Sequence, residues 1–266
     1  MLISIIISTY NWPQALNKVL EALQEQTDRN FEIVIADDGS GIETKKLIQN
    51  WIAKSKVKVI HAWQPDEGFR VSESRNNAVR ASHGDYLVFI DGDCIPRKHF
   101  VEHQRALAEK GYVVAGNRCL LSVSLTATLL TSKKSFHFPF WKLCLLRIKG
   151  DLNRLDALIT LPPNSFFRYR HLTKWQKLRG CNIGVWRQDF ERVNGFDSSF
   201  VGWGFEDSDL AARLINAGVK IKNGAFSTAL LHLYHRESDE IREGHNWERL
   251  QYVLSSDCTQ PVKGLK

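Results

Sequence analysis

The sequence predicts an α/β protein with a Rossmann-like, mostly parallel central sheet flanked by helices. Over the first 117 residues, short apolar runs of strand length alternate with stretches of helix length. This alternation is typical of parallel βαβ units. A length of 266 residues with 43% hydrophobic side chains suffices for one continuous core. We therefore expect a single domain.

The first two strand and helix units are the clearest. "ISIIIS" (3–8) is a β-branched apolar run that fits a strand buried on both faces. Pro13 suits the first turn of a helix that runs to about Gln26, because the missing N–H has no helical partner there. "FEIVIADDGS" (31–40) repeats the pattern and leads into a helix through "ETKKLIQNWIA".

Two further strands follow. "VKVI" (57–60) is the third, and "GDYLVFIDGDC" (84–94) is the fourth, which ends in acidic residues. Between them we expect Ser72 to cap a helix across "ESRNNAVRAS".

Polar clusters follow three of these strands: "STYN" (8–11), "DD" (37–38) and "DGD" (91–93). Ligands of parallel sheets gather beyond the carboxyl ends of the strands, so we expect the clusters to meet at one rim. No GxGxxG or GxxxxGK[ST] follows any strand, which argues against a classical dinucleotide fold and a phosphate-loop nucleotidase. "DGD" can instead hold a divalent ion that bridges a diphosphate.

The net charge of +7 indicates an anionic partner: nucleic acid, a phosphorylated small molecule or an anionic membrane surface. The segment 118–174 mixes aliphatic, aromatic and basic residues. It fits either a helix or lid that packs on the sheet, or a surface that contacts anionic lipid. We find no recognition helix, RNP-like motif or zinc pattern, and we expect no nucleic-acid partner.

The five cysteines are odd in number and scattered, without the paired spacing of disulfide frameworks or zinc sites. They predict reduced thiols in a cytoplasmic protein. The apolar start "MLISIIISTYNWP" lacks a basic region and is too short to span a membrane. Any membrane contact is therefore expected to be peripheral, on the inner face of the cell membrane.

Six motifs in order resemble the inverting family 2 glycosyltransferases of the GT-A fold. They are "IIISTYNWP", "VIADDGS", "SRNNA", "VFIDGDC", "RGCNIGVWRQDFERVNGFDSSFVGWGFEDSDLAARL" and "LLHLYH". The last two are similar to the C-terminal half of β-1,4-galactosyltransferases and bacterial chondroitin polymerases. The resemblance covers residues 1–117 and 178–236. It implies one GT-A domain over 1–266, with a basic and aromatic insert at 118–174 and an acceptor-binding, catalytic half at 175–240.

The resemblance implies a UDP-sugar donor held at the strand ends in the first 117 residues. Ser8 and Tyr10 would hold the nucleotide base, with the Tyr10 ring stacked on it, and Asp38 would accept the uracil N–H. Arg75 would contact the nucleotide part, and Asp91 the ribose or a metal-bound water. Core packing for Tyr10, a backbone-bonded turn for Asp38 and a solvated helix face for Arg75 are the structural alternatives.

The resemblance also implies a divalent cation, held by Asp93 of "DGD" and His235 of "HLYH". We expect His232, the other histidine of that motif, to pack along its strand. A mixed carboxylate and imidazole set favours Mn²⁺ over Mg²⁺. A purely structural histidine is the alternative.

"GWGFED" resembles the galactosyltransferase signature and implies that Asp207 is the general base. Glu206 and Asp209 would grip the acceptor sugar or orient the base, and Trp203 would stack on the sugar. Neighbouring acids raise a carboxyl pKa, which suits a base. The alternative is a helix start whose dipole favours acids by about 0.3–1 kcal/mol each. Phe205 stands where many relatives have glycine, which predicts a reshaped acceptor pocket.

Asn182 and Gly184 are expected to line the donor sugar. The implied reaction is metal-dependent, inverting transfer of a hexose or N-acetylhexosamine from the UDP-sugar to a hydroxyl of a glycan or glycolipid acceptor, in lipopolysaccharide, capsule or other surface polysaccharide synthesis. A sugar-nucleotide hydrolase or nucleotidyltransferase is the alternative enzyme, and a non-catalytic glycan-binding or nucleic-acid-binding protein the alternative outside enzymes. The sequence does not indicate an oligomeric state.

Overall fold

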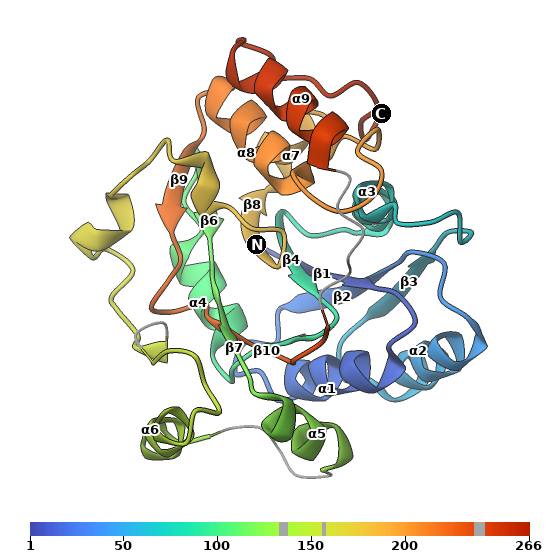
Figure 1. The fold of residues 1–266 in the computed structure, drawn as a ribbon, viewed down its shortest axis with the longest axis vertical. Coiled ribbons are helices and arrows are strands. Elements are labelled where there is room, and N and C mark those ends of the chain that lie inside the picture. Colours follow the sequence, from blue (N-terminus) through green and yellow to red (C-terminus); the bar gives the residue numbers. More distant parts are fainter. Residues whose placement is uncertain (133–137, 156–157, 237–242) are drawn as a thin grey trace.

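A seven-stranded sheet forms the centre of the computed structural model, which describes residues 1–132, 138–155, 158–236 and 243–266 (Figure 1). β8 pairs antiparallel with β4 and β6, whereas the other neighbouring strands are parallel. The mostly parallel sheet confirms the predicted fold class. Across the sheet the strands are β3 (Val59–Trp63), β2 (Phe31–Asp37), β1 (Ile3–Thr9), β4 (Tyr86–Asp91), β8 (Asn182–Trp186), β6 (Tyr112–Ala115) and β9 (Lys220–Asn223).

A second, three-stranded sheet lies beside the first. β10 (Leu230–His232) is its central strand, antiparallel to β5 (Cys94–Ile95) and parallel to β7 (Arg118–Leu120). The helices are α1 (Pro13–Gln24), α2 (Ile42–Lys54), α3 (Val71–Ala81), α4 (Phe100–Leu107), α5 (Val123–Thr131), α6 (Phe140–Ile148), α7 (Arg187–Arg192), α8 (Glu206–Asn216) and α9 (Glu243–Leu254).

The core consists of two apolar layers, one on each face of the large sheet. Ile5 of β1 packs in one layer with Leu16 of α1. Its neighbour Ile6 packs in the other layer, which contains Phe190 of α7 and Leu214 of α8. Successive strand residues point to opposite faces, so the unbroken apolar run of β1 supplies both layers. Figure 1 shows α1 and α2 together on one side of the sheet and α7, α8 and α9 on the other.

The predicted elements of the first 91 residues are present, but the third strand runs over Val59–Trp63 instead of 57–60, and the cap expected of Ser72 is absent. Pro13 begins α1 as expected. Ser72 is not a helix cap, because α3 already begins at Val71 and follows Arg70. The Ser72 hydroxyl is buried without a hydrogen-bond partner among the described residues. The cap expectation was wrong because the helix begins two residues earlier than the serine suggested, with Arg70 at the N-cap position.

The predicted strand over 84–94 is divided at Gly92. β4 ends at Asp91, and Cys94 already belongs to β5 of the second sheet. The Gly92 N–H donates to the Ser8 carbonyl at 2.8 Å, and a Cβ on Gly92 would lie 2.9 Å from that oxygen. A side chain would not fit this close approach. Glycine therefore lets the chain pass from one sheet to the other between the two acids of "DGD".

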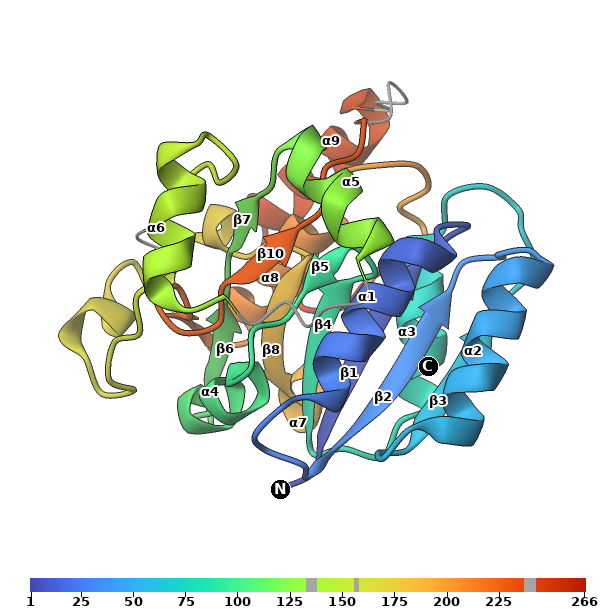
Figure 2. The same cartoon turned by 90° about the horizontal axis from the view of Figure 1, so that it is seen from below.

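The segment 118–174 contains both packed and exposed parts. α5 lies against α1 and buries Leu129 in the core. α6 buries Leu143 and leaves Trp141 and Ile148 exposed at 64% and 81%. Figure 2 shows α6 at the periphery, away from the large sheet. The packing alternative thus holds for α5, whereas α6 presents apolar side chains to solvent.

All five cysteines are free thiols. Among the described residues, no helix combines the length and apolar character needed to cross a membrane.

Candidate active site

The rim expected from the sequence exists at the carboxyl ends of β1, β2 and β4. These strands are adjacent and parallel, and their register places Ser8 opposite Asp91 and Thr9 opposite Asp37. Parallel strands end on the same edge of a sheet, so their polar ends meet there. The first and fourth predicted strands thus bring Ser8 and Asp91 side by side.

Arg75 of α3 lies at the centre of this rim and is 3% exposed. Its Nε donates to Ser8 Oγ at 3.0 Å, its Nη2 lies 3.2 Å from Asp91 Oδ1, and its Nη1 lies 3.2 Å from Glu206 Oε1. Burial alone would lower the pKa of Arg75, but the carboxylates of Asp91 and Glu206 outweigh it and raise the pKa. The solvated-face alternative for Arg75 is therefore wrong. This guanidinium connects the rim to the start of α8.

Tyr10 and Asp38 lie at the end of β1 and just beyond the end of β2. The Tyr10 ring is 52% exposed, and its hydroxyl donates to Asp66 at 2.9 Å. Core packing is thus excluded for Tyr10, and its ring is accessible to a ligand. The buried Asp38 carboxylate accepts hydrogen bonds from Gln64 Nε2 and from the Arg70 N–H. Burial raises the pKa of Asp38.

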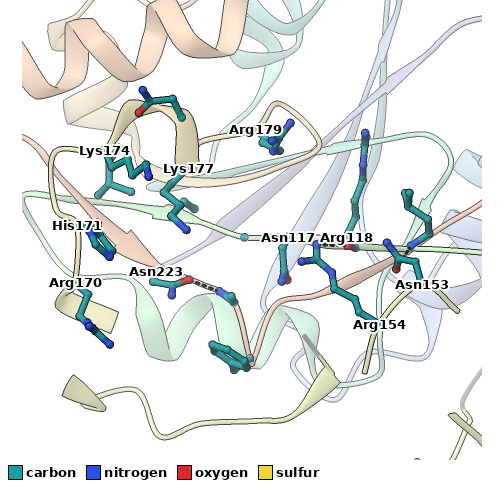
Figure 3. A pocket seen from close by; sticks show the side chains of 17 residues that line it. Asn117, Arg118, Asn153, Arg154, Arg170, His171, Lys174, Lys177, Arg179 and Asn223 are labelled. Carbon is teal, nitrogen blue, oxygen red and sulfur yellow. Dashed lines mark hydrogen bonds between the residues drawn. The ribbon is translucent and has the colours of Figure 1, made fainter. Parts of the chain in front are cut away.

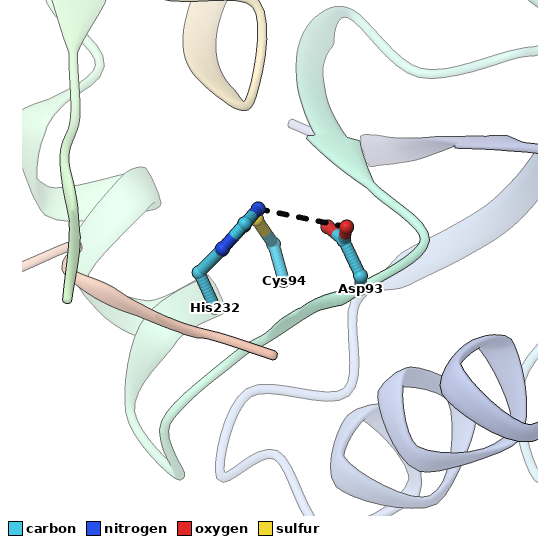
Figure 4. Close-up of side chains that lie close together, drawn as sticks. All are labelled: Asp93, Cys94 and His232. Carbon is cyan, nitrogen blue, oxygen red and sulfur yellow. Dashed lines mark ion pairs between the residues drawn. The ribbon is translucent and has the colours of Figure 1, made fainter. Parts of the chain in front are cut away.

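Asp93 and two histidines form a second polar cluster, beside β5 and β10. Asp93 Oδ2 lies 3.5 Å from His232 Nε2 and 3.3 Å from His235 Nε2. Cys94 Sγ, His232 and Asp93 offer ligand atoms within 4.8 Å of one another (Figure 4). His232 is buried on its strand as expected, but its ring nitrogen also reaches Asp93. The sequence predicted His235 as the ligand, and the structure places His232 near Asp93 as well.

The electrostatics of this cluster fit a divalent cation. Asp93 Oδ1 is buried and has no hydrogen-bond partner among the described residues. Burial raises the pKa of Asp93 to about 6, and neighbouring Asp91 adds to the shift, whereas His235 opposes it. Burial lowers the pKa of His232 to about 3, so this imidazole is neutral at pH 7. A buried carboxylate oxygen without a partner and a neutral imidazole are suitable ligands for a metal ion.

Arg118 of β7 is a neighbour of this cluster that sequence analysis missed. Burial alone would lower its pKa, but nearby thiols and the carboxylates of Asp91 and Asp93 raise it. β7 pairs with β10 in a register that places Arg118 opposite Leu230, two residues before His232. This proximity depends on pairing between strands 112 positions apart, which no local motif in the sequence indicates.

A sharp turn precedes the three acids at the start of α8. Gly202, Gly204 and Phe205 all have positive φ, with Phe205 at 70°. This left-handed conformation is uncommon for a bulky residue. The Phe205 ring packs against Trp247 of α9 at 5.2 Å between centroids. The backbone at Phe205 thus adopts the conformation that glycine favours, and the ring contact supports it.

Glu206 and Asp207 lie in the first turn of α8. Asp207 Oδ2 accepts a hydrogen bond from the Gly180 N–H at 2.8 Å, and its Oδ1 accepts one from Ser208 Oγ at 3.2 Å. Burial and then the charge of Asp207 raise the pKa of Glu206 to about 7, although Arg75 opposes the shift. The neighbouring acids were expected to raise the pKa of a carboxyl group here, and that group is Glu206.

The geometry does not support three expected contacts with sugars. Asp209 is 1% exposed and pairs with the fully buried Arg213, so its carboxylate cannot reach an acceptor. Asn182 is fully buried and donates to the carbonyls of Asn117 and Thr228. Gly184 lies where a Cβ would be 2.4 Å from the Tyr86 hydroxyl oxygen. Asp209 and Asn182 thus bond buried partners, and Gly184 leaves room for the Tyr86 hydroxyl.

Trp203 remains available for the role expected of it. Its side chain is 53% exposed in the turn before α8. An exposed indole is a suitable surface for the apolar face of a sugar.

Two family models match the chain. "Glycosyl transferase family 2" matches residues 4–173, and "N-terminal domain of galactosyltransferase" matches residues 164–236. The two matches meet in the segment that follows α6, so together they cover the rim, the Asp93 cluster and the start of α8.

Curated relatives cover a similar part of the chain. Validoxylamine A glucosyltransferase from Streptomyces hygroscopicus subsp. jinggangensis is 28% identical over 82% of this chain and 52% of the relative. Chondroitin synthase and hyaluronan synthase from Pasteurella multocida are 27% and 32% identical, each over 81% of this chain and 23% of the relative. The chain thus spans about half the length of the validoxylamine A glucosyltransferases and about a quarter of the two synthases.

Solved structures share the fold. S. aureus TarS 1–349 in complex with UDP has a TM-score of 0.64 and 16% identity, covering 97% of this chain and 65% of that one. Mannosyltransferase PcManGT from Pyrobaculum calidifontis, in complex with GDP-Man and Mn²⁺, has a TM-score of 0.59 and 17% identity, covering 94% and 60%. At these identities the likeness concerns the fold alone.

Proposed function

The protein belongs to glycosyl transferase family 2 and has the GT-A fold, and from this premise we propose that it is a metal-dependent, inverting glycosyltransferase. It transfers a hexose or N-acetylhexosamine from a UDP-sugar to a hydroxyl of a glycan acceptor. The observation that carries the proposal is Arg75, which binds Asp91 of the strand-end rim and Glu206 beside the candidate base. One side chain thereby connects the expected donor and acceptor ends.

The UDP-sugar lies along the rim, with its base at Tyr10 and Asp38. The exposed Tyr10 ring offers a stacking surface, and the Asp38 carboxylate is an acceptor for an imide N–H. Asp38 is already bound by two donors, which orients its carboxylate. Arg75 and Ser8 bond each other at the same edge and would contact the nucleotide part of the donor. The UDP-bound relative of the same fold supports this donor class.

Asp93, His235 and His232 would hold the divalent cation. The carboxylate with a free buried oxygen and the two imidazoles near it favour Mn²⁺ over Mg²⁺, because imidazole prefers the transition ion. When bound, the cation would neutralise the negative charge that develops on the departing diphosphate. A similar fold with Mn²⁺ and a nucleotide-sugar supports this assignment.

Asp207 accepts the proton of the acceptor hydroxyl as the hydroxyl oxygen bonds to the anomeric carbon. The bond from that carbon to the diphosphate oxygen breaks on the opposite face, so the configuration inverts and UDP leaves with the electron pair. The Gly180 N–H fixes Asp207 Oδ2 and thereby the direction of the carboxylate. Trp203 and Glu206 receive the acceptor sugar. Buried Asp209 binds Arg213 of the same helix, and Arg213 donates to the carbonyls of Val193 and Gly195, which anchors the helix that carries the base.

The acceptor is a surface glycan or a glycolipid, such as a lipopolysaccharide, capsule or other polysaccharide precursor. The synthase relatives support a polysaccharide product. The exposed apolar side chains of α6 support peripheral contact with the inner face of the cell membrane. Residues 118–174 then form the variable part of one domain, between the nucleotide-sugar-binding half and the acceptor-binding half.

A panel of UDP-sugars tests the proposal, with UDP release measured in the presence and absence of candidate glycans and Mn²⁺. We expect one UDP-sugar to give glycan-stimulated release and a product of inverted configuration by NMR. UDP release that no glycan stimulates indicates a sugar-nucleotide hydrolase, and pyrophosphate-dependent UTP formation indicates a nucleotidyltransferase. Either result contradicts the proposed transfer.

A further inference from the structure

A basic cavity of about 640 Å³ lies beside the candidate active site (Figure 3). Its walls come from 115–120, 153–154, 170–179 and 221–226. Six cationic side chains line it, together with His171 and several amides, and no carboxylate is among the lining residues. The six are Arg118, Arg154, Arg170, Lys174, Lys177 and Arg179.

These cations form no direct ion pair among the described residues, although Asp91 and Asp93 lie near Arg118. Within the part of the chain that the structure describes, none of the six has a carboxylate within ion-pair distance, whereas nearby Lys222 pairs with Glu109 at 2.8 Å. Like charges gathered in a concave site repel one another and create a positive potential that attracts anions. The positive potential of the cavity therefore favours binding of a negatively charged ligand.

The cations lie on two walls of the cavity. Figure 3 shows Arg170, Lys174 and Lys177 on one side and Arg118 with Arg154 on the other. Arg154 Nη2 donates to the Arg118 carbonyl at 2.8 Å, which holds its guanidinium in place. Guanidinium groups bind carboxylates and phosphates through two parallel hydrogen bonds. A ligand between the walls would meet positive charge from both sides.

The cavity adjoins the candidate active site at two residues. Arg118 of β7 pairs with Leu230 of β10, two residues before His232 of the Asp93 cluster. Arg179 directly precedes Gly180, whose N–H holds the Asp207 carboxylate. A glycan whose reacting hydroxyl lies at Asp207 can thus extend another part of itself into the cavity.

We propose that this cavity is an acceptor subsite that binds an anionic group of the glycan, a sugar carboxylate or a phosphate. The inference rests on the proposed transfer reaction and specifies the chemical class of its acceptor. The volume falls within the range of small-molecule sites, about 300–1,000 Å³. A concave site lined by cations from two walls suits a discrete anionic group better than the plane of a membrane. The substrate is therefore an acidic glycan or a phosphorylated one.

Direct binding tests the proposal without donor, metal or turnover. The probes are a galacturonate hexamer, which carries carboxylates, and inorganic pyrophosphate, which carries phosphates. Maltohexaose is the neutral probe of matched length, and vesicles of phosphatidylglycerol with phosphatidylcholine represent a lipid surface. Affinities are measured by calorimetry in EDTA at two salt concentrations. We expect saturable binding of at least one anionic probe, weakened by salt, and none of maltohexaose.

Charge reversal locates the binding site. We expect Lys174→Glu with Lys177→Glu to weaken binding of the anionic probe at least tenfold. The matched control is Lys45→Glu with Lys46→Glu, which makes the same charge change at two exposed positions of α2. Thermal melts establish that both variants fold. Unchanged affinity in the cavity variant, an equal loss in the control, or binding of vesicles without binding of either free anion overturns the proposal.

This experiment separates the subsite from the reaction. If the anionic probe binds in the cavity but no UDP-sugar supports transfer, the proposed function fails and the subsite stands. If transfer occurs to a neutral glycan and neither anionic probe binds, the subsite fails and the function stands.

Discussion

Arg75 Nη1 lies 3.2 Å from Glu206 Oε1, although 131 residues separate the two in the chain. The same guanidinium binds Asp91 at the end of β4. A buried cation between two carboxylates offsets their mutual repulsion and fixes their separation. This contact joins the strand-end rim to the first turn of α8, so it determines how the proposed donor and acceptor ends of the site are placed.

Replacing Arg75 by Gln should destabilise the fold. The change leaves two acids facing each other without the buried cation, and removal of one partner from a buried pair costs about 3–5 kcal/mol. Urea unfolding measures the loss. The control is Arg192→Gln, whose exposed pair with Asp189 should contribute less than about 1 kcal/mol. Equal stability of the two variants would show that Arg75 is not structurally important.

Replacing Asp207 by Asn should reduce turnover about 10²- to 10⁴-fold, because an amide cannot accept the hydroxyl proton. Affinity for UDP and Mn²⁺ should change little, since Asp207 lies on the acceptor side. Steady-state kinetics and UDP calorimetry give the two quantities. A turnover within threefold of the parent enzyme would exclude Asp207 as the base.

Replacing Asp93 by Ala should abolish Mn²⁺-dependent binding of UDP, because the central carboxylate of the cluster is lost. His235→Ala and His232→Ala should each weaken Mn²⁺ binding. Calorimetric titration with Mn²⁺ is the measurement, and Asp257→Ala, at an exposed position far along the chain, is the control. Mn²⁺ affinity that is unchanged in all three cluster variants would contradict the assigned metal site.

The raised pKa of the Glu206 carboxyl should make the free energy of unfolding decrease as the pH rises. Its pKa in the folded protein is about 7, above the ordinary value of 4.5, so the folded state holds the proton more tightly than the unfolded state. The stabilisation is complete below about pH 4.5 and is lost as the pH rises through 7. A shift of this size corresponds to at most about 3 kcal/mol.

Glu206→Gln provides the comparison. Urea unfolding at pH 5 and pH 8 should show the variant gaining stability relative to the parent as the pH increases. The pKa of Glu206 already includes the attraction of Arg75 for the ionised carboxylate. Effects of the substitution that do not depend on pH cancel when the two pH values are compared. A relative stability that does not change between pH 5 and 8 would refute the raised pKa.

Local patterns in the sequence were sufficient for the elements of the first 91 residues and for the acids at the start of α8. The apolar runs of β1 and β2 and the position of Pro13 follow from strand burial and from the missing proline N–H. The turn at Gly92 was not predicted, because its cause is the approach of another strand rather than the local sequence.

Long-range partners explain the other differences. Asp209 is an acid like Glu206 and Asp207 in the sequence, but its carboxylate is buried and accepts a hydrogen bond from Arg213, one helical turn later. Asn182 is a polar residue in a strand, and its buried amide donates to the carbonyls of Asn117 and Thr228, which lie in distant segments of the chain. Arg118 reaches the Asp93 cluster only through pairing of β7 with β10. These contacts depend on tertiary structure, which residue type and spacing do not encode locally.

The passage of the chain at Gly92 also limits how the "DGD" motif can vary. Asp91 is the last residue of β4 in the seven-stranded sheet, and Asp93 directly precedes β5 in the three-stranded sheet. Only Gly92 separates the two acids. Inserting or deleting one amino acid there would move Asp93 away from His232 of β10 and from His235, three residues later. The two sheets share one apolar layer, in which Ile90 of β4 and Ile95 of β5 both pack. The spacing of the motif is thus set by how the two sheets pack together, in addition to supplying two negative charges.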